Sequence, residues 1–227
     1  MRVACTFALL FFVIALGEHA FTVDSINDDQ SNCSLWTRGK FSRPLIVIDG
    51  FYANPDQVRS FALSQNFNVS GNYPGHRTRD FATNEHKEVF ENILGKKITY
   101  WPTSKPGSLS YNGAFQLALS KHRSWIHRDK TDHSAIVFLS PNAPLHSGTS
   151  LYRHTSTGST YETSEHKTLM DRDSSDVHAW TVTDEVTNIY NRLVIFDGRR
   201  SHMSNPYFGT DFQTGRLFQT FFFDVEK

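Results

Sequence analysis

The chain has 227 residues, of which 38% are hydrophobic and 14% aromatic, and its formal net charge is +0. This length accommodates one domain with a substantial core and leaves little room for a second domain. The balanced charge gives no indication of a nucleic-acid or acidic-polymer partner. The 19 phenylalanines favour an aromatic core rich in β-structure.

The start of the chain has the pattern of a targeting segment. A nearly continuous apolar run from Val3 to Leu16 is short for a membrane span but suits the core of a signal peptide. We therefore predict a signal peptide over 1–17, with cleavage as late as Ala20, and an address in the secretory pathway without a membrane span after cleavage. A buried helix or an uncleaved anchor is the alternative. A loosely ordered segment over 18–43 and a single domain over 44–227 are expected to follow.

Two sequons agree with secretion, Asn32-Cys33-Ser34 and Asn68-Val69-Ser70, and each marks a candidate glycan on an exposed loop. Cys5 lies within the predicted signal peptide, which leaves Cys33 as the single cysteine of the mature chain. An internal disulfide is therefore excluded there, and Cys33 is either free or pairs with another chain.

The first part of the domain carries two helical patterns. The apolar run 44–50 ends in glycine and predicts a buried strand. Asn54-Pro55 then predicts the start of a helix that continues to about residue 65. A turn is expected at 72–75, and a second helix over 84–94, because apolar residues recur on one face and a glycine follows.

From residue 107 onward the pattern changes to that of β-strands. Apolar and polar residues alternate over 109–117, and further strands are predicted at 135–139, 148–154, 192–196 and 216–223. Many short strands separated by Gly and Pro turns favour a sandwich-like architecture. We predict a mostly β fold with flanking helices, a sandwich or jelly roll.

A long polar stretch between His154 and Thr183 interrupts the strands and carries a short helical pattern near 165–170. It is long for a simple connection. The sequence leaves two interpretations open, a lid over a site and a surface insertion without a chemical role.

Three residues have the spacing of a metal site. Residues two apart on a strand point to the same side, so His127 and Asp129 can reach one ion together. A third ligand must come from a neighbouring strand far along the chain, and His202 follows directly after a predicted strand. Two histidines and one carboxylate bind non-haem Fe(II) and leave other positions open. Six other histidines compete for this role and are more simply explained as surface or core residues: His122, His133, His146, His154, His166 and His178.

Arg216 completes the pattern, because it opens the last long strand shortly after His202. A buried guanidinium offers a fork of donors that matches a carboxylate. 2-Oxoglutarate could chelate the iron through its keto acid and place its distal carboxylate on this fork, with one position left for O₂. An arginine paired with a protein carboxylate is the alternative. The carboxylate at Asp129 favours hydroxylation, because an apolar residue there would leave a position for halide.

With these residues the chain resembles the 2-oxoglutarate/Fe(II)-dependent dioxygenase superfamily, with a prolyl-hydroxylase-like core. It is most similar to a poorly characterised single-domain branch, a domain-of-unknown-function family. The similar segments extend across nearly the whole domain: Val47 to Pro55, Tyr73 to Gly75, Gly113 to Gln116, Trp125 to Asp129, Leu151 to His154, Asn191 to Gly198 and Gly215 to Phe223. The resemblance implies a double-stranded β-helix with iron on His127, Asp129 and His202 and 2-oxoglutarate on Arg216.

The chain departs from the superfamily at one position. Many members carry Ser or Thr two residues after the arginine, where this chain has Phe218. Thr220, on the same strand face, is the first candidate to help hold the distal carboxylate. Tyr111 and Asn112, from the earlier strand pattern, are two others.

The sequence therefore predicts an enzyme that uses Fe(II), 2-oxoglutarate and O₂, with ascorbate as a candidate reductant. It would hydroxylate an aliphatic C–H bond of a peptidyl residue or a small metabolite and convert 2-oxoglutarate to succinate. A secretory address disfavours nucleic acid as the substrate. Two alternatives stay open, a non-catalytic jelly-roll binding module and a metal-dependent enzyme that does not use 2-oxoglutarate. The fold does not name the substrate.

Overall fold

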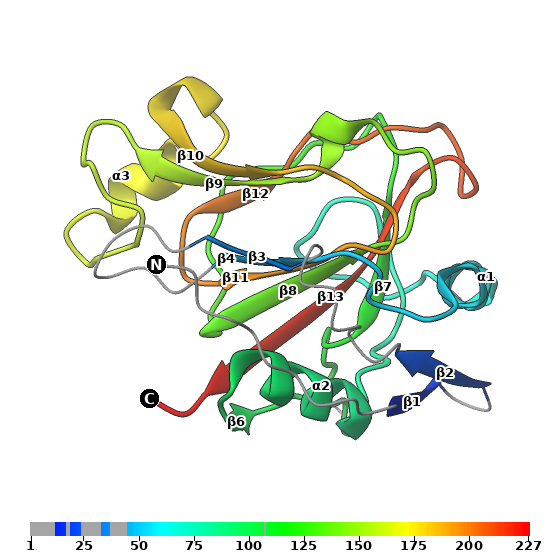
Figure 1. The fold of residues 1–227 in the computed structure, drawn as a ribbon. Helices are drawn as coiled ribbons and strands as arrows, with labels where there is room; N and C mark the ends of the chain where they lie inside the picture. The colour runs from blue at the N-terminus through cyan, green and yellow to red at the C-terminus, as the bar shows by residue number, and fades with distance from the viewer. Residues whose placement is uncertain (1–11, 17–18, 24–32, 37–44, 107) are drawn as a thin grey trace.

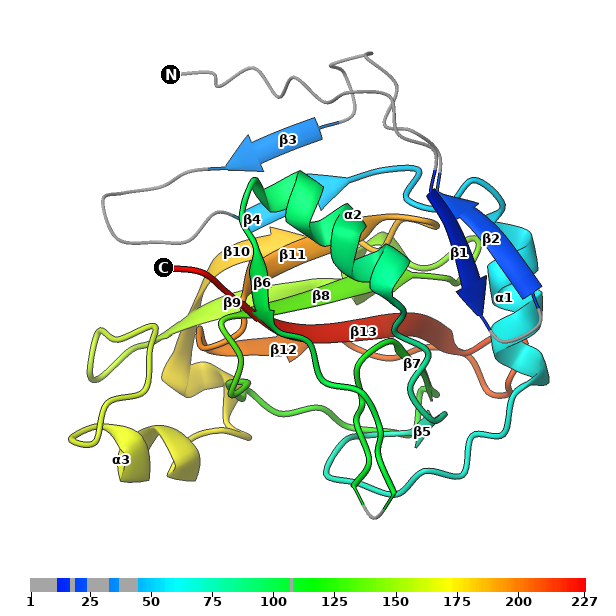
Figure 2. The same ribbon diagram turned by 90° about the horizontal axis from the view of Figure 1, so that it is seen from below.

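The computed structural model describes residues 12–16, 19–23, 33–36, 45–106 and 108–227. Within these residues no helix is both long enough and apolar enough to cross a membrane. The strands and helices lie in the arrangement that Figure 1 shows from the side and Figure 2 from below.

The predictions for the N-terminus fall mostly outside the described residues, namely the signal peptide over 1–17 and much of the segment over 18–43. Where the chain is described, β1 (Phe12–Leu16) pairs with β2 (His19–Val23), and β3 (Cys33–Trp36) pairs with the first strand of the domain. β2 and β3 lie within the segment over 18–43, and the loose order of this segment stays a prediction.

The domain itself is built mainly from short antiparallel strands. They are β4 (Leu45–Ile48), β5 (His76–Arg77), β6 (Ile98–Tyr100), β7 (Ala114–Ala118), β8 (His133–Phe138), β9 (Thr149–His154), β10 (Trp180–Val186), β11 (Leu193–Asp197), β12 (His202–Ser204) and β13 (Arg216–Val225). The helices are α1 (Pro55–Ser64), α2 (Asn84–Leu94) and α3 (Lys167–Arg172), with the single-turn helices η1 (Leu145–Ser147) and η2 (Val177–Ala179).

The strands form a major and a minor sheet. The major sheet has the order β3-β4-β11-β8-β13-β7-β5, with β6 on β13, and the minor sheet has the order β10-β9-β12. A bridge between His127 and His202 adds one more segment to the free edge of β12. From β7 to β13 the chain crosses repeatedly between the two sheets, which face each other in Figure 1. This is the predicted mostly β jelly roll, and the fold prediction is confirmed.

Alternation along the central strands builds two cores. Val137 of β8 and Leu217 of β13 belong to the larger core, which also contains residues of α1 and α2. Their neighbours Ile136 and Phe218 belong to a second core that includes Leu151 of the minor sheet. Because both faces of the major sheet are covered, its central strands are almost continuously buried. The face that carries Phe218 is the one that looks into the space between the sheets.

Both predicted helices are confirmed to within a residue. Thr83 caps α2 with its side chain, and Gly95 ends it in the left-handed conformation with φ 62. Pro55 begins α1, as its fixed φ favours, although the Asn54 side chain makes no capping hydrogen bond. In Figure 2, α2 lies across the outer face of the major sheet.

The predicted strand over 109–117 is wrong in its first half. The strand begins only at Ala114, because Gly113 has φ +73 and a Cβ there would lie 2.2 Å from the backbone nitrogen of Ala82. The amide of Asn112 donates to the Ser110 hydroxyl at 3.0 Å, which holds the preceding residues in a loop. Alternating polarity alone does not reveal this turn.

The fold contains a buried histidine that predicts acid sensitivity. His86 is fully buried, its Nε2 lies 3.0 Å from the Tyr52 hydroxyl, and burial lowers its pKa to about 3. Unfolded histidine titrates near pH ~6.5. Between these values only the unfolded chain binds the proton, so the free energy of unfolding should decrease as the pH falls through this window. Urea unfolding at a series of pH values measures the slope.

His86→Gln should flatten that slope, because the titrating group is removed, whereas His178→Gln, at an exposed position, should leave it unchanged. An equal slope for the wild type and His86→Gln would assign the acid sensitivity to other groups.

Candidate active site

The three predicted ligands lie on two segments that pair directly. His127 and Asp129 lie between β7 and β8, and His202 is the first residue of β12. The amides of His127 and His202 each donate to the other's carbonyl at 2.9 Å. The amide of Asp129 donates to the carbonyl of Gly198 at 2.7 Å. The expectation of a regular strand at 127–129 is wrong, since one bridge and this turn contact hold the segment.

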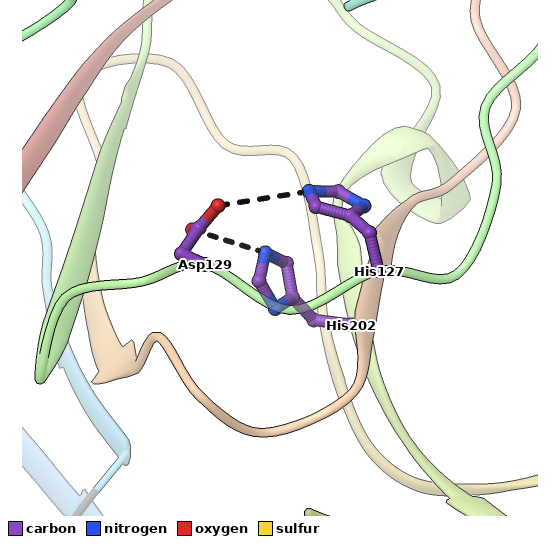
Figure 3. Close-up of side chains that lie close together, drawn as sticks. All are labelled: His127, Asp129 and His202. Atoms are coloured by element: carbon purple, nitrogen blue, oxygen red, sulfur yellow. Dashed lines mark ion pairs between the residues drawn. The ribbon is translucent and has the colours of Figure 1, made fainter. Parts of the chain in front are cut away.

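The ligand atoms of the three residues converge (Figure 3). Nε2 of His127 lies 4.0 Å from Oδ1 of Asp129, and Nε2 of His202 lies 3.4 Å from Oδ2. All three ligand atoms lie within 4.8 Å of one another, and among the described residues no other group of His, Cys, Asp and Glu does so. The His127 side chain is 40% exposed, against 6% for His202, so solvent reaches the cluster from the His127 side.

Backbone carbonyls orient both imidazoles for metal binding. Nδ1 of His127 lies 3.0 Å from the carbonyl of Trp125, and Nδ1 of His202 lies 2.8 Å from the carbonyl of Arg200. A carbonyl only accepts, so each Nδ1 carries the proton and each Nε2 keeps a lone pair. Metal-binding histidines commonly make this contact.

The charges at the cluster also suit a cation. Desolvation, together with His202, holds the pKa of His127 below its usual range. Burial raises the pKa of Asp129, but the neighbouring His202, His127 and Ser134 outweigh it and hold this pKa at about 2. At neutral pH His127 is therefore neutral and Asp129 is ionised, so neither has to release a proton to a metal.

Two residues that the sequence did not single out support Asp129. The hydroxyl of Ser134 donates to Oδ2 of Asp129 at 2.5 Å. Gly198 leaves room for this contact. A Cβ at this position would lie 2.6 Å from Oγ of Ser134 and 3.3 Å from Cβ of Asp129, so any side chain would collide. Neither residue has a sequence signal, because only the fold brings them to the ligand.

Ser134→Ala is expected to weaken Fe(II) binding by about 10-fold, the lower end of the range for losing a partner of a metal ligand. The carboxylate would lose the donor that fixes its orientation. Metal titration with Fe(II) under argon measures the change. Ser147→Ala is the matched control, because Ser147 is equally buried and its hydroxyl donates to Pro144; equal affinities for both variants would contradict the role of Ser134.

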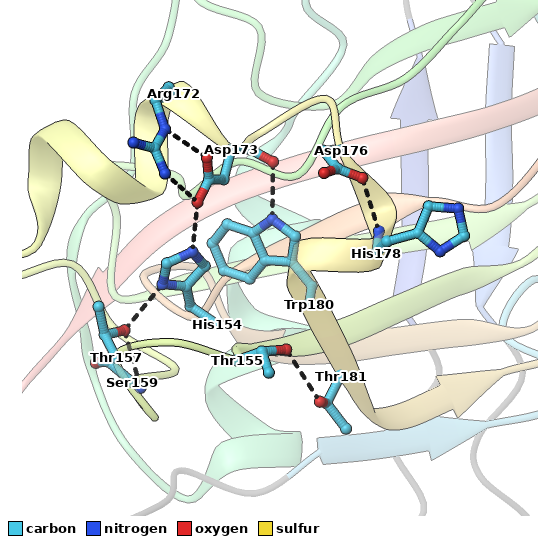
Figure 4. Close-up of polar contacts among 10 residues, drawn as sticks. All are labelled: His154, Thr155, Thr157, Ser159, Arg172, Asp173, Asp176, His178, Trp180 and Thr181. Carbon is cyan, nitrogen blue, oxygen red and sulfur yellow. Dashed lines mark hydrogen bonds and ion pairs between the residues drawn. The ribbon is translucent and has the colours of Figure 1, made fainter.

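His154, a competing histidine, lies in a separate cluster (Figure 4). Its Nε2 lies 3.1 Å from Oδ2 of Asp173 and its Nδ1 lies 3.0 Å from the hydroxyl of Thr157. Its ring packs against Trp180 with centroids 4.6 Å apart. Both ring nitrogens are engaged, and this pair attaches β9 to the segment that carries α3.

Arg128, between the two ligands, also contacts that segment. Its Nη2 lies 2.5 Å from carboxylate oxygens of both Glu162 and Asp171. The ligand-bearing turn is thereby joined to α3, which lies near the predicted helix at 165–170. Whether the segment acts as a lid stays a prediction.

Arg216 is fully buried at the start of β13. Nη2 donates to the carbonyl of Gly148 at 2.9 Å, whereas Nε and Nη1 have no hydrogen-bond partner among the described residues. Its Cζ lies 4.6 Å from the ring centroid of Phe218 and 5.4 Å from that of Tyr207. Burial lowers its pKa to about 10, so it stays charged at neutral pH. A buried charge with unused donors fits an anionic ligand.

The register places Arg216 and the metal cluster along one face of β13. Thr220 pairs with Ile136, and Phe222 pairs with Ser134, the residue bonded to Asp129. Arg216 and Thr220 share this face, because residues two and four apart on a strand do so. Thr220 thus lies between Arg216 and the level of Ser134, although its hydroxyl contacts the carbonyl of Ala114 at 3.4 Å.

The other two predicted cosubstrate contacts have different neighbours. Asn112 is buried, and its amide group is engaged by the backbone of Pro102 and Phe222. Tyr111 donates to the carbonyl of Ser70 at 3.2 Å and lies beside another arginine, described below. Their roles toward 2-oxoglutarate stay predictions. Tyr207, which contacts Arg216, was missed because it follows proline in a polar loop and has no periodic pattern.

One solved structure agrees with this architecture at the level of the fold, and a second is a weaker match. A crystal structure of HygX from Streptomyces hygroscopicus with nickel and 2-oxoglutarate bound matches with a TM-score of 0.50 and 12% identity, covering 78% of this chain and 80% of that chain. A structure of the selenomethionine-labelled Fe(II)/α-ketoglutarate-dependent dioxygenase TqaL matches with a TM-score of 0.39 and 13% identity, covering 77% and 76%. At the level of the fold, the predicted resemblance is confirmed.

Comparison by sequence gives two further findings. No curated protein matches the chain. A model described as "Family of unknown function (DUF6445)" matches residues 30–223, and this agrees with the predicted uncharacterised branch. Because the match covers most of the sequence, the chain belongs to the DUF6445 family.

Proposed function

We propose that this protein is an Fe(II)- and 2-oxoglutarate-dependent dioxygenase that hydroxylates an aliphatic C–H bond of a peptidyl residue or small metabolite. The reaction consumes the substrate, O₂ and 2-oxoglutarate and yields the alcohol, succinate and CO₂. His127, Asp129 and His202 would hold the metal through two Nε2 atoms and a carboxylate oxygen. Arg216 would hold the distal carboxylate of 2-oxoglutarate.

The observation that carries this proposal is the buried guanidinium of Arg216, whose Nε and Nη1 have no hydrogen-bond partner among the described residues. A metal cluster alone is compatible with many enzymes, including those that do not use 2-oxoglutarate. A fully buried arginine with two unused donor atoms, on the sheet face that leads to the cluster, specifically favours a dicarboxylic cosubstrate. A non-catalytic jelly roll would need neither feature.

The chain's own residues prepare the site for this chemistry. Bound Fe(II) would activate O₂ and couple the decarboxylation of 2-oxoglutarate to oxidation of the substrate. The backbone carbonyls of Trp125 and Arg200 hold the imidazoles in the metal-binding tautomer. Ser134 fixes the carboxylate of Asp129. Phe138, Phe196 and Phe218 exclude water from the space between the sheets.

Succinate formation tests the proposal directly. The purified protein should convert 2-oxoglutarate to succinate slowly in the absence of substrate, with Fe(II), O₂ and ascorbate present, and a chelator should abolish the conversion. Added Zn(II) should occupy the cluster without restoring turnover. Turnover that persists without Fe(II), or no succinate from protein that demonstrably holds Fe(II), would contradict the proposal.

We also propose that the protein acts in the secretory pathway. The apolar run Val3–Leu16 and the sequon at Asn68 support this address, and the Asn68 side chain belongs to an exposed residue. Expression in a eukaryotic cell should give a glycosidase-sensitive protein whose apparent mass decreases in Asn68→Gln. Protein that stays unglycosylated in the cytosol would contradict it. Pairing of Cys33 with another chain stays a prediction.

A further inference from the structure

Arg77 is a second buried guanidinium on the same face of the major sheet as Arg216. It belongs to β5, where it pairs with Gln116 of β7, and Gln116 pairs with Phe218 of β13. Residues directly opposite one another on neighbouring strands point to the same face of a sheet. Arg77 therefore faces the space between the sheets, on the side where Arg216 and Phe218 lie.

The contacts of Arg77 hold it firmly but leave its charge unneutralised. Nε donates to Oε1 of Gln116 at 3.1 Å and Nη2 donates to the same oxygen, while Nε2 of Gln116 donates to the carbonyl of Pro74 at 2.6 Å. Cζ lies 3.8 Å from the ring centroid of Tyr73 and 5.1 Å from that of Tyr111. Arg77 is 7% exposed, and no described carboxylate lies within ion-pair distance. Nη1 donates no hydrogen bond among the described residues.

Two tyrosines form an aromatic frame around this guanidinium. The rings of Tyr73 and Tyr111 lie edge to face, with centroids 5.7 Å apart, and their hydroxyls donate to the carbonyls of Val69 and Ser70. Gly71 permits this arrangement, because a Cβ there would lie 2.4 Å from the ring of Tyr73 and 2.7 Å from the hydroxyl of Tyr111. Both tyrosines are partly exposed, so the frame is open to solvent.

The sheet face of Arg77 also leads to the candidate metal cluster, because Phe222, four residues after Phe218 on β13, pairs with Ser134, whose hydroxyl donates to Asp129. Burial lowers the pKa of Arg77 to about 10, so the guanidinium stays charged at neutral pH. Arg216, on the same sheet face, also lies beside a tyrosine, since its Cζ is 5.4 Å from the ring centroid of Tyr207.

We propose that Arg77, framed by Tyr73 and Tyr111, binds the carboxylate of the molecule that the enzyme oxidises, a small organic acid with an apolar or aromatic body. This inference rests on the proposed function, because it assigns the substrate end of the same site. Arg216 serves the cosubstrate and Arg77 the substrate. The tyrosine rings would cover the apolar body while the carboxylate accepts from Nη1.

The donor supply favours a carboxylate over a phosphate. Gln116 already occupies Nε and Nη2, so Nη1 is the main donor left for a ligand. A phosphate dianion carries three acceptor oxygens and would need more donors than this. The hydroxyls of Tyr73 and Tyr111 are engaged by the backbone and cannot supply them. A monoanion flanked by aromatic rings fits both the charge and the surroundings.

Simple acids and their amides test the proposal. Calorimetric titrations of the Fe(II)- and 2-oxoglutarate-loaded protein, prepared without oxygen, would use acetate and benzoate, with acetamide and benzamide as uncharged matches. We expect at least one acid to bind about 10- to 100-fold more tightly than its amide, as for loss of a charged hydrogen bond. Arg77→Gln should remove this preference. Arg79→Gln, which changes an exposed arginine two residues away, should retain it.

The affinity of Arg77→Gln for 2-oxoglutarate distinguishes the role of Arg77 from that of Arg216. This affinity should stay within about twofold of the wild-type value, because the lost charge contact would not involve the cosubstrate. A large decrease there would instead assign Arg77 to the cosubstrate and overturn the proposal. So would equal binding of acids and amides, no binding of either acid, or a preference that survives in Arg77→Gln. If Arg77→Gln does not fold, Arg77→Lys replaces it. The lysine lacks the guanidinium fork, so the preference for the acid over its amide should decrease in this variant as well.

Failure of the proposed function would be recognised separately. If the wild type binds no 2-oxoglutarate, the same acid and amide titrations without cosubstrate still decide whether Arg77 is a carboxylate site.

Discussion

Arg216→Gln is expected to weaken 2-oxoglutarate binding by about 100-fold, corresponding to the loss of a charge-assisted bidentate contact. Glutamine keeps part of the volume but has neither the charge nor the fork. Fe(II) affinity should not change, because Arg216 does not contact the metal cluster. Titration of 2-oxoglutarate into the metal-loaded protein without oxygen measures the difference.

Arg192→Gln is the matched control for this experiment. Arg192 is partly buried, whereas Arg216 is fully buried, and the Arg192 guanidinium pairs with Asp49, with Nε 2.6 Å from the carboxylate. Its loss should affect stability and leave cosubstrate affinity unchanged. Arg216→Lys should fall between the wild type and Arg216→Gln, because it keeps the charge but not the planar fork. Unchanged 2-oxoglutarate affinity in Arg216→Gln would mean that another group holds the cosubstrate.

Asp129→Ala is expected to abolish succinate formation and to weaken Fe(II) binding by more than about 100-fold, since even supporting residues of metal ligands are worth up to that amount. Removing the carboxylate deletes the single acidic side chain of the candidate cluster and leaves only the two imidazoles. Metal titration and a succinate assay on the same preparation measure the two effects.

Asp173→Asn provides the comparison for Asp129→Ala. Asp173 also faces a histidine, since its Oδ2 lies 3.1 Å from Nε2 of His154, but it lies outside the metal cluster. This variant should keep both Fe(II) binding and turnover. Turnover that persists in Asp129→Ala, or an equal loss in both variants, would contradict the assignment of the ligands.

The sequence predicted most elements of the fold because local patterns encode them. The cap at the end of α2 and the proline at the start of α1 are local signals, and both helices lie where they were expected. The apolar runs of β8, β11 and β13 are equally local, because both faces of these strands are buried. The convergence of His127, Asp129 and His202 was likewise expected from their residue types and order, and their role as metal ligands stays a prediction.

The features that the sequence does not predict depend on contacts between segments that are distant along the chain. His127 lies in a bridge to His202 rather than in a regular strand, and no local pattern reports this pairing. Ser134 and Gly198 act on Asp129 only because β8 and the end of β11 meet there. Arg77 lies in a two-residue strand, too short for any periodicity to reveal its direction.

The absorption spectrum of the protein with Fe(II) and 2-oxoglutarate, in the absence of oxygen, tests most directly whether the candidate site binds both together. A keto acid that chelates Fe(II) gives a weak visible charge-transfer band. We expect this band in the wild type, its loss in His202→Ala, and a much higher 2-oxoglutarate requirement in Arg216→Gln. A protein that holds Fe(II) and binds 2-oxoglutarate without the band, or a band that persists in His202→Ala, would contradict this expectation.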